Sequence, residues 1–270
     1  MAGGKGMLIQ AKSIPEALLG MKTVPDCLAG GTYVLSSLFM EKPDSLLSLR
    51  EIPELQGISD QGDLVRIGAL VTFQEALESE LLPGYAKEAL SFMGSRTKRN
   101  MATVGGNTAL WRGDSYLASM LLASGAKIET AMDLHGETVT ETLPAGAFPG
   151  KREGRLITAI CLKKGITGAS RRYANTLQSH AELTVSMSLE DGIFTAAAAE
   201  RTSGVFLMQE LSERLSHGIP DEILIQEIRD FCGGLEAIQT DDRCSAEYKR
   251  YLLSTAIWDL YAALRGEAAS

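Results

Sequence analysis

The sequence predicts an α+β protein in two parts, and two observations indicate it. Over the first 50 residues, short apolar runs alternate with helical patterns, which favours a small parallel sheet with connecting helices. From about residue 168 the pattern changes to one β-hairpin followed only by helices. A chain of 270 residues also exceeds a typical single domain. We therefore expect one domain over residues 1–165 and a second over residues 168–270.

The first domain is expected to open with a short apolar strand from residue 7. Ser13 and Pro15 then have the pattern of a helix N-cap and first turn. Residues 24–29 predict a buried strand, and residues 44–49 predict another.

The central segment is expected to add a strand over residues 63–70. Thr72 and Glu75 follow it with the spacing of a capping box at the start of a helix. Further helices are predicted over residues 81–93 and from about Ser115.

Three strands are expected to complete this domain. The first two cover residues 126–131 and 137–142, with the turn sequence "DLHG" at 133–136 between them. The third covers residues 154–164.

The second domain is expected to begin with a hairpin over residues 181–200. Its two runs are joined by Asp191 and Gly192, a dipeptide suited to a tight turn. Helices are then predicted over residues 204–216, 221–232 and 245–265, the last one capped by Ser245. One side of this last helix is expected to carry Tyr248, Leu252, Trp258 and Tyr261.

The composition excludes several classes of function. The net charge of −8 and the pI of about 5.1 give no support to nucleic-acid binding. The cysteines stand far apart, at Cys27, Cys161, Cys232 and Cys244, and form no C-x-x-C pair that would indicate a zinc or iron–sulfur site. No run is apolar enough for a membrane span or a signal core, so we expect a cytoplasmic protein that binds no metal and no membrane.

Two segments share one design, in which a strand is followed by two adjacent glycines, a Thr or Asn, and a helix. They are "LAGGTYV" at 28–34 and "TVGGNTA" at 103–109. In the first, Thr32 is expected to cap a helix whose apolar positions are Val34, Leu35, Leu38 and Phe39. The first turn of a helix leaves N–H groups unpaired, and glycine lets a phosphate reach them. Neither loop has a Rossmann or P-loop fingerprint, but two such loops suit a ligand with two phosphates.

Both loops resemble those of the FAD-binding (medium) subunits of molybdenum hydroxylases, the xanthine dehydrogenase and carbon monoxide dehydrogenase group. The family's first loop is similar to A-G-G-T-D/E-L and its second to R-N-x-G/A-T-I/V-G-G-N. The matching residues here are Ala29, Gly30, Gly31 and Thr32, then Arg99, Asn100, Ala102, Thr103, Val104, Gly105, Gly106 and Asn107. The stretches 48–58, 65–75 and 245–253 also resemble the family, so the likeness covers almost the whole chain in order.

This resemblance implies a fold and a cofactor. The fold would be a two-lobed α/β FAD-binding domain of the PCMH type, with lobes at about 1–55 and 56–165. A C-terminal domain with a small antiparallel sheet and helices would follow it. Both loops would hold the pyrophosphate and adjoining ribose of FAD. The implied cofactor-binding residues are Leu28, Ala29, Gly30, Gly31, Thr32, Tyr33, Val34, Thr103, Val104, Gly105, Gly106, Asn107 and Asp114.

The resemblance also implies a function within a complex. The chain would pass electrons from iron–sulfur clusters on a partner through FAD to NAD or another acceptor. Its partners would be a molybdopterin-binding large subunit and a 2Fe-2S small subunit. Since a bound flavin supplies the redox chemistry itself, no catalytic acid or base is expected here.

The chain departs from the family pattern at several positions. Tyr33 and Tyr116 stand where the family has acidic residues, and Tyr173 where it often has a basic one. Asp114, two residues before Tyr116, either reaches the ribose or adenine or caps the next helix. Trp111 either stacks on the cofactor or packs in the core or against a partner.

Two alternatives stay open, the first motivated by these departures and the second by a related flavin fold. One is an assembly subunit of the same complex that has lost its flavin. The other is a free-standing FAD oxidoreductase of the vanillyl-alcohol-oxidase type, for whose substrate domain this chain is short.

Overall fold

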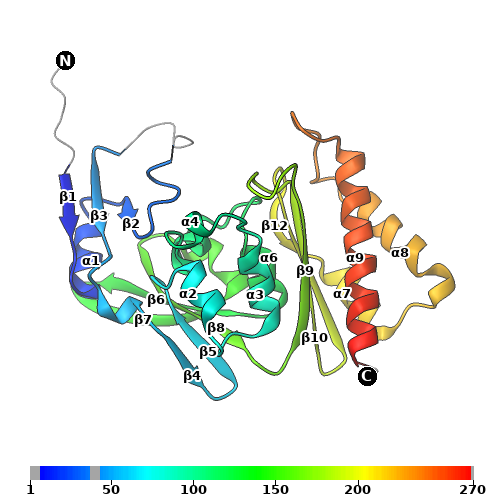
Figure 1. The fold of residues 1–270 in the computed structure, drawn as a ribbon, viewed down its shortest axis with the longest axis horizontal. Coiled ribbons are helices and arrows are strands. Elements are labelled where there is room, and N and C mark those ends of the chain that lie inside the picture. Colours follow the sequence, from blue (N-terminus) through cyan, green and yellow to red (C-terminus); the bar gives the residue numbers. More distant parts are fainter. Residues whose placement is uncertain (1–6, 37–42, 269–270) are drawn as a thin grey trace. The chain divides into compact units, whose positions relative to one another are not determined.

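The computed structural model describes residues 7–36 and 43–268 (Figure 1). The chain divides into two compact units. Its first unit comprises Met1–Leu81, Ser95–Ala109 and Lys127–Leu162, and the second comprises Leu82–Gly94, Leu110–Ala126 and Lys163–Ser270. The second unit therefore takes two segments from the N-terminal half of the chain.

A small parallel sheet opens the first unit. Its strands are β1 (Met7–Gln10), β3 (Ser45–Ser48) and β2 (Cys27–Leu28), in the order β1-β3-β2. Helix α1 (Ile14–Met21) connects the first two strands along the chain and begins as predicted, because the Ser13 hydroxyl accepts a hydrogen bond from the Glu16 N–H. The strand predicted over 24–29 shrinks to two residues, since Pro25 has no N–H for a ladder.

The helix expected after Thr32 is wrong over the residues described. Residues 32–35 form a turn, in which the Leu35 N–H donates to the Gly31 carbonyl at 3.1 Å. Thr32 therefore caps no helix there, and Gly31 has a left-handed φ of +79° that a helical residue does not adopt. Leu38 and Phe39 lie outside the described residues.

A five-stranded sheet forms the rest of the first unit. Its order is β4-β5-β8-β6-β7, with β4 (Ile58–Gln61), β5 (Leu64–Gly68), β8 (Arg155–Lys163), β6 (Lys127–Leu134) and β7 (Glu137–Pro144). The strands predicted from the sequence are confirmed here, and β4 is an addition. Its last three residues are polar and exposed, so they carry no apolar alternation, and Gly62 at φ +76° turns the chain into β5. Single 3₁₀ turns cover Pro53–Leu55, Ala145–Ala147 and Pro149–Lys151.

Short helices of the first unit precede and contain the second glycine pair. Helix α2 (Phe73–Glu78) begins with the predicted capping box of Thr72 and Glu75. The segment before the glycines is a helix, α4 (Arg96–Arg99), where a strand was expected. The glycines at 105 and 106 lie inside helix α5 (Val104–Leu110), not ahead of it.

The second unit is built on an antiparallel sheet in the order β12-β11-β10-β9. The predicted hairpin is confirmed as β10 (Leu183–Glu190) and β11 (Ile193–Glu200), joined at Asp191 and Gly192 with φ of +49° and +82°. Strands β9 (Thr167–Tyr173) and β12 (Gly204–Leu207) extend it on either side. The helix predicted over 204–216 is wrong in its first part, because Val205 and Phe206 pair with β11.

Helices of the second unit contact this sheet. Helix α3 (Gly84–Ser91) contacts β9 and α6 (Ala118–Ala123) contacts β10, while α7 (Gln209–His217), α8 (Asp221–Gly233) and α9 (Ala246–Ala268) form an apolar core with the sheet. Successive side chains of strand β10 point to opposite faces of the sheet. Val185 joins the core with α7–α9, and Ser186 hydrogen-bonds Ser119 of α6.

Helix α9 differs from the predicted pattern of its apolar side. Tyr261 is buried as expected, but the side chains of Tyr248 and Trp258 are half exposed. Leu253, Ile257 and the residues that follow at helical spacing make the buried side. Among the residues that the structure describes, no helix combines the length and apolar character that a bilayer crossing needs.

Candidate functional site

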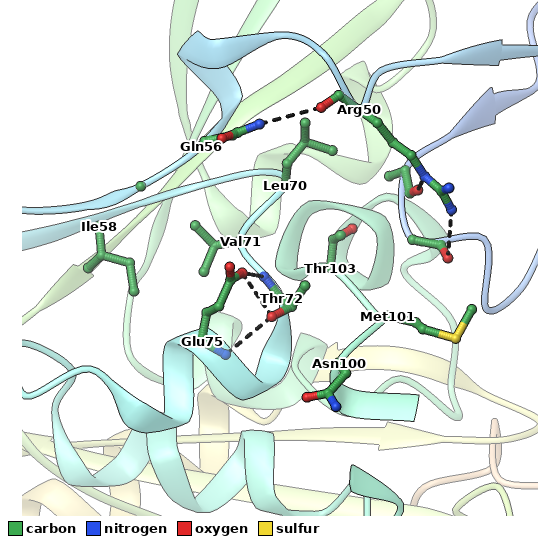
Figure 2. A pocket seen from close by; sticks show the side chains of 13 residues that line it. Arg50, Gln56, Ile58, Leu70, Val71, Thr72, Glu75, Asn100, Met101 and Thr103 are labelled. Carbon is green, nitrogen blue, oxygen red and sulfur yellow. Dashed lines mark hydrogen bonds between the residues drawn. The ribbon is translucent and has the colours of Figure 1, made fainter. Parts of the chain in front are cut away.

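A cavity of about 710 Å³ lies within the first unit. This volume falls in the range of small-molecule and cofactor sites. Figure 2 shows residues of both glycine loops around it, together with the segment that leads into helix α2. The lining residues are Ala29, Gly30, Arg50, Gln56, Gly57, Ile58, Leu70, Val71, Thr72, Glu75, Asn100, Met101 and Thr103. Two segments that are far apart in the sequence, and that were selected from it independently, therefore border one cavity.

The first loop has backbone N–H groups that form no hydrogen bond with the described residues. The N–H groups of Gly30, Gly31, Thr32 and Val34 donate to no acceptor among residues 7–36 and 43–268. Unpaired N–H groups gathered in one short turn are the donors that an anion requires. This loop therefore has the donor chemistry expected of a phosphate-binding segment.

The second loop is different, because the first-turn N–H groups of helix α5 already have partners. The Val104 N–H donates to the Val71 carbonyl and the Gly105 N–H to the Ala69 carbonyl, both at 2.9 Å. Thr103 accepts the next two, through its hydroxyl from Gly106 at 3.1 Å and through its carbonyl from Asn107 at 3.0 Å. The expectation that this helix start leaves free N–H groups for a phosphate is therefore wrong.

The glycines of both loops have a reason in packing. A Cβ on Gly30 would lie 1.9 Å from the Met101 carbonyl oxygen, so glycine lets the two loops touch. A Cβ on Gly105 would lie 2.6 Å from the Ala69 Cβ and 2.7 Å from the Ala69 oxygen. Gly105 thus allows helix α5 to approach the segment after β5 closely enough for its hydrogen bonds.

The structure places the predicted site residues in several kinds of position. Ala29, Gly30 and Thr103 line the cavity. Gly31 follows Gly30 in the chain, and residues 32–35 form the turn described above. Leu28 is buried at the end of β2, and Val104 and Gly105 are buried in α5. Gly106 and Asn107 are half-buried in α5, while Tyr33 and Val34 are half-buried in the turn and Thr32 is exposed.

Arg50 is a cavity residue that no prediction named. It follows strand β3, its Nε donates to the Ala29 carbonyl at 2.8 Å, and its Nη2 makes a longer contact of 3.5 Å with the Gly30 carbonyl. It forms no ion pair with a described residue, so its charge is not neutralised by a described carboxylate. A sequence signal existed, since a charged residue just past the carboxyl end of a parallel strand stands where such sheets bind ligands.

Glu75 is the carboxylate among the lining residues, and its role is local. Its Oε2 accepts from the Thr72 N–H at 2.7 Å and from the Thr72 hydroxyl at 2.8 Å. These hydrogen bonds hold its negative charge at the start of α2, where the helix dipole favours it.

Asp114 belongs to the second unit, where its carboxylate has two basic partners. Arg112 reaches it with Nε at 2.9 Å and Nη2 at 3.0 Å, and the His180 Nδ1 lies 3.0 Å away. Burial alone would raise the pKa of Asp114, but hydrogen bonds from His180 and Arg112 lower it. The alternative that Asp114 caps the next helix is wrong, because the Ser115 hydroxyl accepts from the Ala118 N–H at 3.2 Å.

Two of the aromatic departures from the expected pattern, Tyr116 and Tyr173, also lie in the second unit, whereas Tyr33 lies in the first. The Arg172 guanidinium stands over the Tyr116 ring, 5.4 Å from its centre, which is within the range of a cation–π interaction. Trp111 has a φ of +42°, an uncommon value for a residue with a side chain. In the described part of the chain, no cluster of His, Cys, Asp and Glu is arranged to hold a metal ion.

Comparison with known proteins places these features in context. Residues 5–162 match the family model described as the FAD binding domain in molybdopterin dehydrogenase. The chain is 28% identical to the uncharacterized protein YgfM of Escherichia coli K12 over 240 residues, which cover 87% of this chain and 85% of that protein. It is also 28% identical to the nicotinate dehydrogenase FAD-subunit of Eubacterium barkeri over 151 residues, which cover 53% of this chain and 48% of that protein.

Solved structures confirm the α+β fold class. A chain of the carbon monoxide dehydrogenase from Hydrogenophaga pseudoflava that lacks the Mo-pyranopterin moiety superposes with a TM-score of 0.85. The alignment covers 98% of this chain and 99% of that one, at 20% sequence identity. The two chains therefore share a fold.

Proposed function

This chain belongs to the family of FAD-binding domains in molybdopterin dehydrogenases, and we propose that it is the electron-transfer subunit of such an enzyme. Its cofactor is FAD, and it is the FAD-binding medium subunit of an oxidoreductase of the molybdenum hydroxylase type. In the proposal, electrons from iron–sulfur clusters on a partner chain leave through this subunit to NAD or another acceptor.

The single observation that carries the proposal is the cavity of about 710 Å³ that both glycine loops line. Its residues fit the cofactor because the first loop has N–H groups without an acceptor among the described residues, and because Arg50 adds a positive charge to the cavity lining. Both features suit the pyrophosphate of a dinucleotide.

Each predicted site residue has a proposed part in holding FAD. In the first loop, residues 28–34, the N–H groups of Gly30, Gly31, Thr32 and Val34 would donate to the pyrophosphate, and the other residues would hold the turn in place. The second loop, residues 103–107, would shape the cavity wall, since its own N–H groups are engaged. Asp114 would approach the ribose or adenine while keeping its ion pairs. When bound, FAD supplies the redox chemistry, and the protein orients it and sets its environment.

The proposed partners are a molybdopterin-binding large subunit and a 2Fe-2S small subunit, in a cytoplasmic complex. Support comes from the family match and from the nicotinate dehydrogenase relative, which is named as an FAD-subunit. The substrate would bind on the large subunit. This chain would then determine which acceptor receives the electrons, and it would not determine which substrate is oxidised.

The first experiment is the visible absorbance spectrum of the purified chain, before and after incubation with FAD and desalting. Flavin bands that stay with the protein and bleach on reduction are the expected result, and Gly30→Val should abolish them. Gly150→Ala is the matched control, because a Cβ at Gly150 meets no atom within 4 Å. A colourless protein after reconstitution would contradict the assignment of the first loop.

The second experiment tests electron transfer in the holoenzyme, purified through a tag on this chain. Molybdenum, iron and flavin should copurify, and NAD⁺ or an artificial acceptor should reoxidise the dithionite-reduced complex. The flavin bands should return in parallel with those of the iron–sulfur centres. A complex that contains this chain but no flavin would refute the proposal and favour the assembly subunit.

A further inference from the structure

Arg50 joins the end of strand β3 to the first glycine loop through the carbonyl groups of that loop. Its Nε donates to the Ala29 oxygen at 2.8 Å, and its Nη2 lies 3.5 Å from the Gly30 oxygen. The Gln56 side chain in turn donates to the Arg50 carbonyl at 3.4 Å. Figure 2 shows this guanidinium beside the loop, at the edge of the cavity.

Because peptide groups are planar, this contact also sets the direction of two N–H groups. In a planar trans peptide the C=O of one residue and the N–H of the next point in opposite directions. The Ala29 carbonyl shares its peptide with the Gly30 N–H, and the Gly30 carbonyl shares its peptide with the Gly31 N–H. A guanidinium that holds these two carbonyls therefore directs both N–H groups away from itself. Those are two of the N–H groups that have no acceptor among the described residues.

The contact also keeps the carbonyl oxygens of the loop from turning towards a bound anion. Glycines rotate their peptide groups easily, so the same segment could turn carbonyl oxygens towards an anion as readily as N–H groups. Carbonyl oxygens near a phosphate would repel it. Hydrogen bonds from a charged guanidinium are stronger than neutral ones and hold the carbonyls on the opposite side.

We propose that Arg50 is the residue that positions the first glycine loop for the pyrophosphate of FAD. It acts by fixing the Ala29 and Gly30 carbonyls, and its Nη1, which donates to no acceptor among the described residues, adds a positive charge at the cavity edge. This inference rests on the proposed function and adds to it the residue that determines which way the loop faces.

The test measures the Kd of FAD and of riboflavin for the apoprotein by titration calorimetry. Riboflavin lacks the pyrophosphate and the adenosine, so it reports only on the part of the site that holds the flavin ring and the ribityl chain. Arg50→Met should weaken FAD binding about tenfold or more, as expected when hydrogen bonds to a charged group are lost. Arg50→Lys keeps the charge but not the planar fork of donors, and should fall between Met and the wild type. Arg96→Met is the control, because Arg96 is an exposed arginine of the same unit, paired with Glu78 at 3.5 Å.

The possible results test the role of Arg50 separately from the proposed function. A loss of FAD affinity with unchanged riboflavin affinity, partly rescued by Lys, supports the inference. FAD affinity equal to that of the wild type in Arg50→Met overturns it, and so does an equal loss for both ligands, which would mean that Arg50 only stabilises the fold. Wild-type protein that fails to bind FAD would overturn the proposed function and this inference with it.

Discussion

Gly105→Ala tests why the second loop contains adjacent glycines. A Cβ at this position would lie 2.6 Å from the Ala69 Cβ and 2.9 Å from the Ala69 Cα. Ordinary van der Waals contact starts at 3.4 Å, so helix α5 or the segment after β5 must retreat by about 0.8 Å. The clash involves backbone atoms and a side chain without rotamers, so nothing can rotate out of the way.

The expected cost follows from two contributions. Overpacking of a close contact costs about 1–3 kcal/mol. The retreat also stretches the hydrogen bonds from the Val104 and Gly105 N–H groups, each now 2.9 Å long, and each worth about 0.5–1.5 kcal/mol. We therefore expect a loss of roughly 2–4 kcal/mol in the free energy of unfolding, and a fall in Tm of about 4–16 °C at roughly 2–4 °C per kcal/mol.

The assay is thermal and urea unfolding of the apoprotein, so that cofactor binding does not contribute. Gly150→Ala is the control, since its Cβ enters open space. Ala69→Gly in the Gly105→Ala background removes the closest clashing atom and should restore part of the loss. Unchanged stability of Gly105→Ala apoprotein, together with lost FAD binding, would refute the packing argument and restore the phosphate interpretation of these glycines.

Three further predictions concern other parts of the chain. Gly30→Ala places a Cβ 1.9 Å from the Met101 oxygen, so the two loops must separate, and the Kd of FAD should rise about tenfold or more in a fluorescence titration. Thr72→Ala removes a helix cap and should cost about 0.5–2 kcal/mol of stability in urea unfolding, most of which Thr72→Ser should restore. Lys249 and Glu200 form a fully buried ion pair at 2.7 Å, and Lys249→Met should cost about 3–5 kcal/mol because it strands the carboxylate. Burial alone would raise the pKa of Glu200, but hydrogen bonds from Lys249 and two hydroxyls lower it. The ionised Glu200 therefore adds to the free energy of unfolding above a pH of about 4.3, and this stabilisation is lost as the pH falls further. The Lys249→Met variant should lose less stability than the wild type over that acid range.

Local signals predicted much of the secondary structure. The capping box at Thr72, the N-cap at Ser13 and the turn at Asp191 and Gly192 each depend on atoms within a few residues of one another. Strand β12 escaped prediction because its residues are held in the sheet by pairing with β11, and such pairing is not visible in a short window of sequence.

The candidate site was predicted in part. The motifs around Gly30 and Thr103 indicated two loops that serve one ligand, and the structure brings residues of both to one cavity. Arg50 was missed because its significance depends on carbonyl groups about 20 residues earlier in the chain. The partners of Asp114 were missed for a similar reason, since His180 is distant in sequence.

By itself, the sequence determined the family, the cofactor class and the order of most strands and helices, because these depend on motifs and on periodic burial. Only the tertiary structure decided which glycine loop retains free N–H groups. The first loop keeps them because its turn pairs with no described strand, whereas the second loop donates its own to Val71 and Ala69. Hydrogen-bond partners of this kind are chosen by packing between distant segments, so two nearly identical glycine motifs acquire different chemistry.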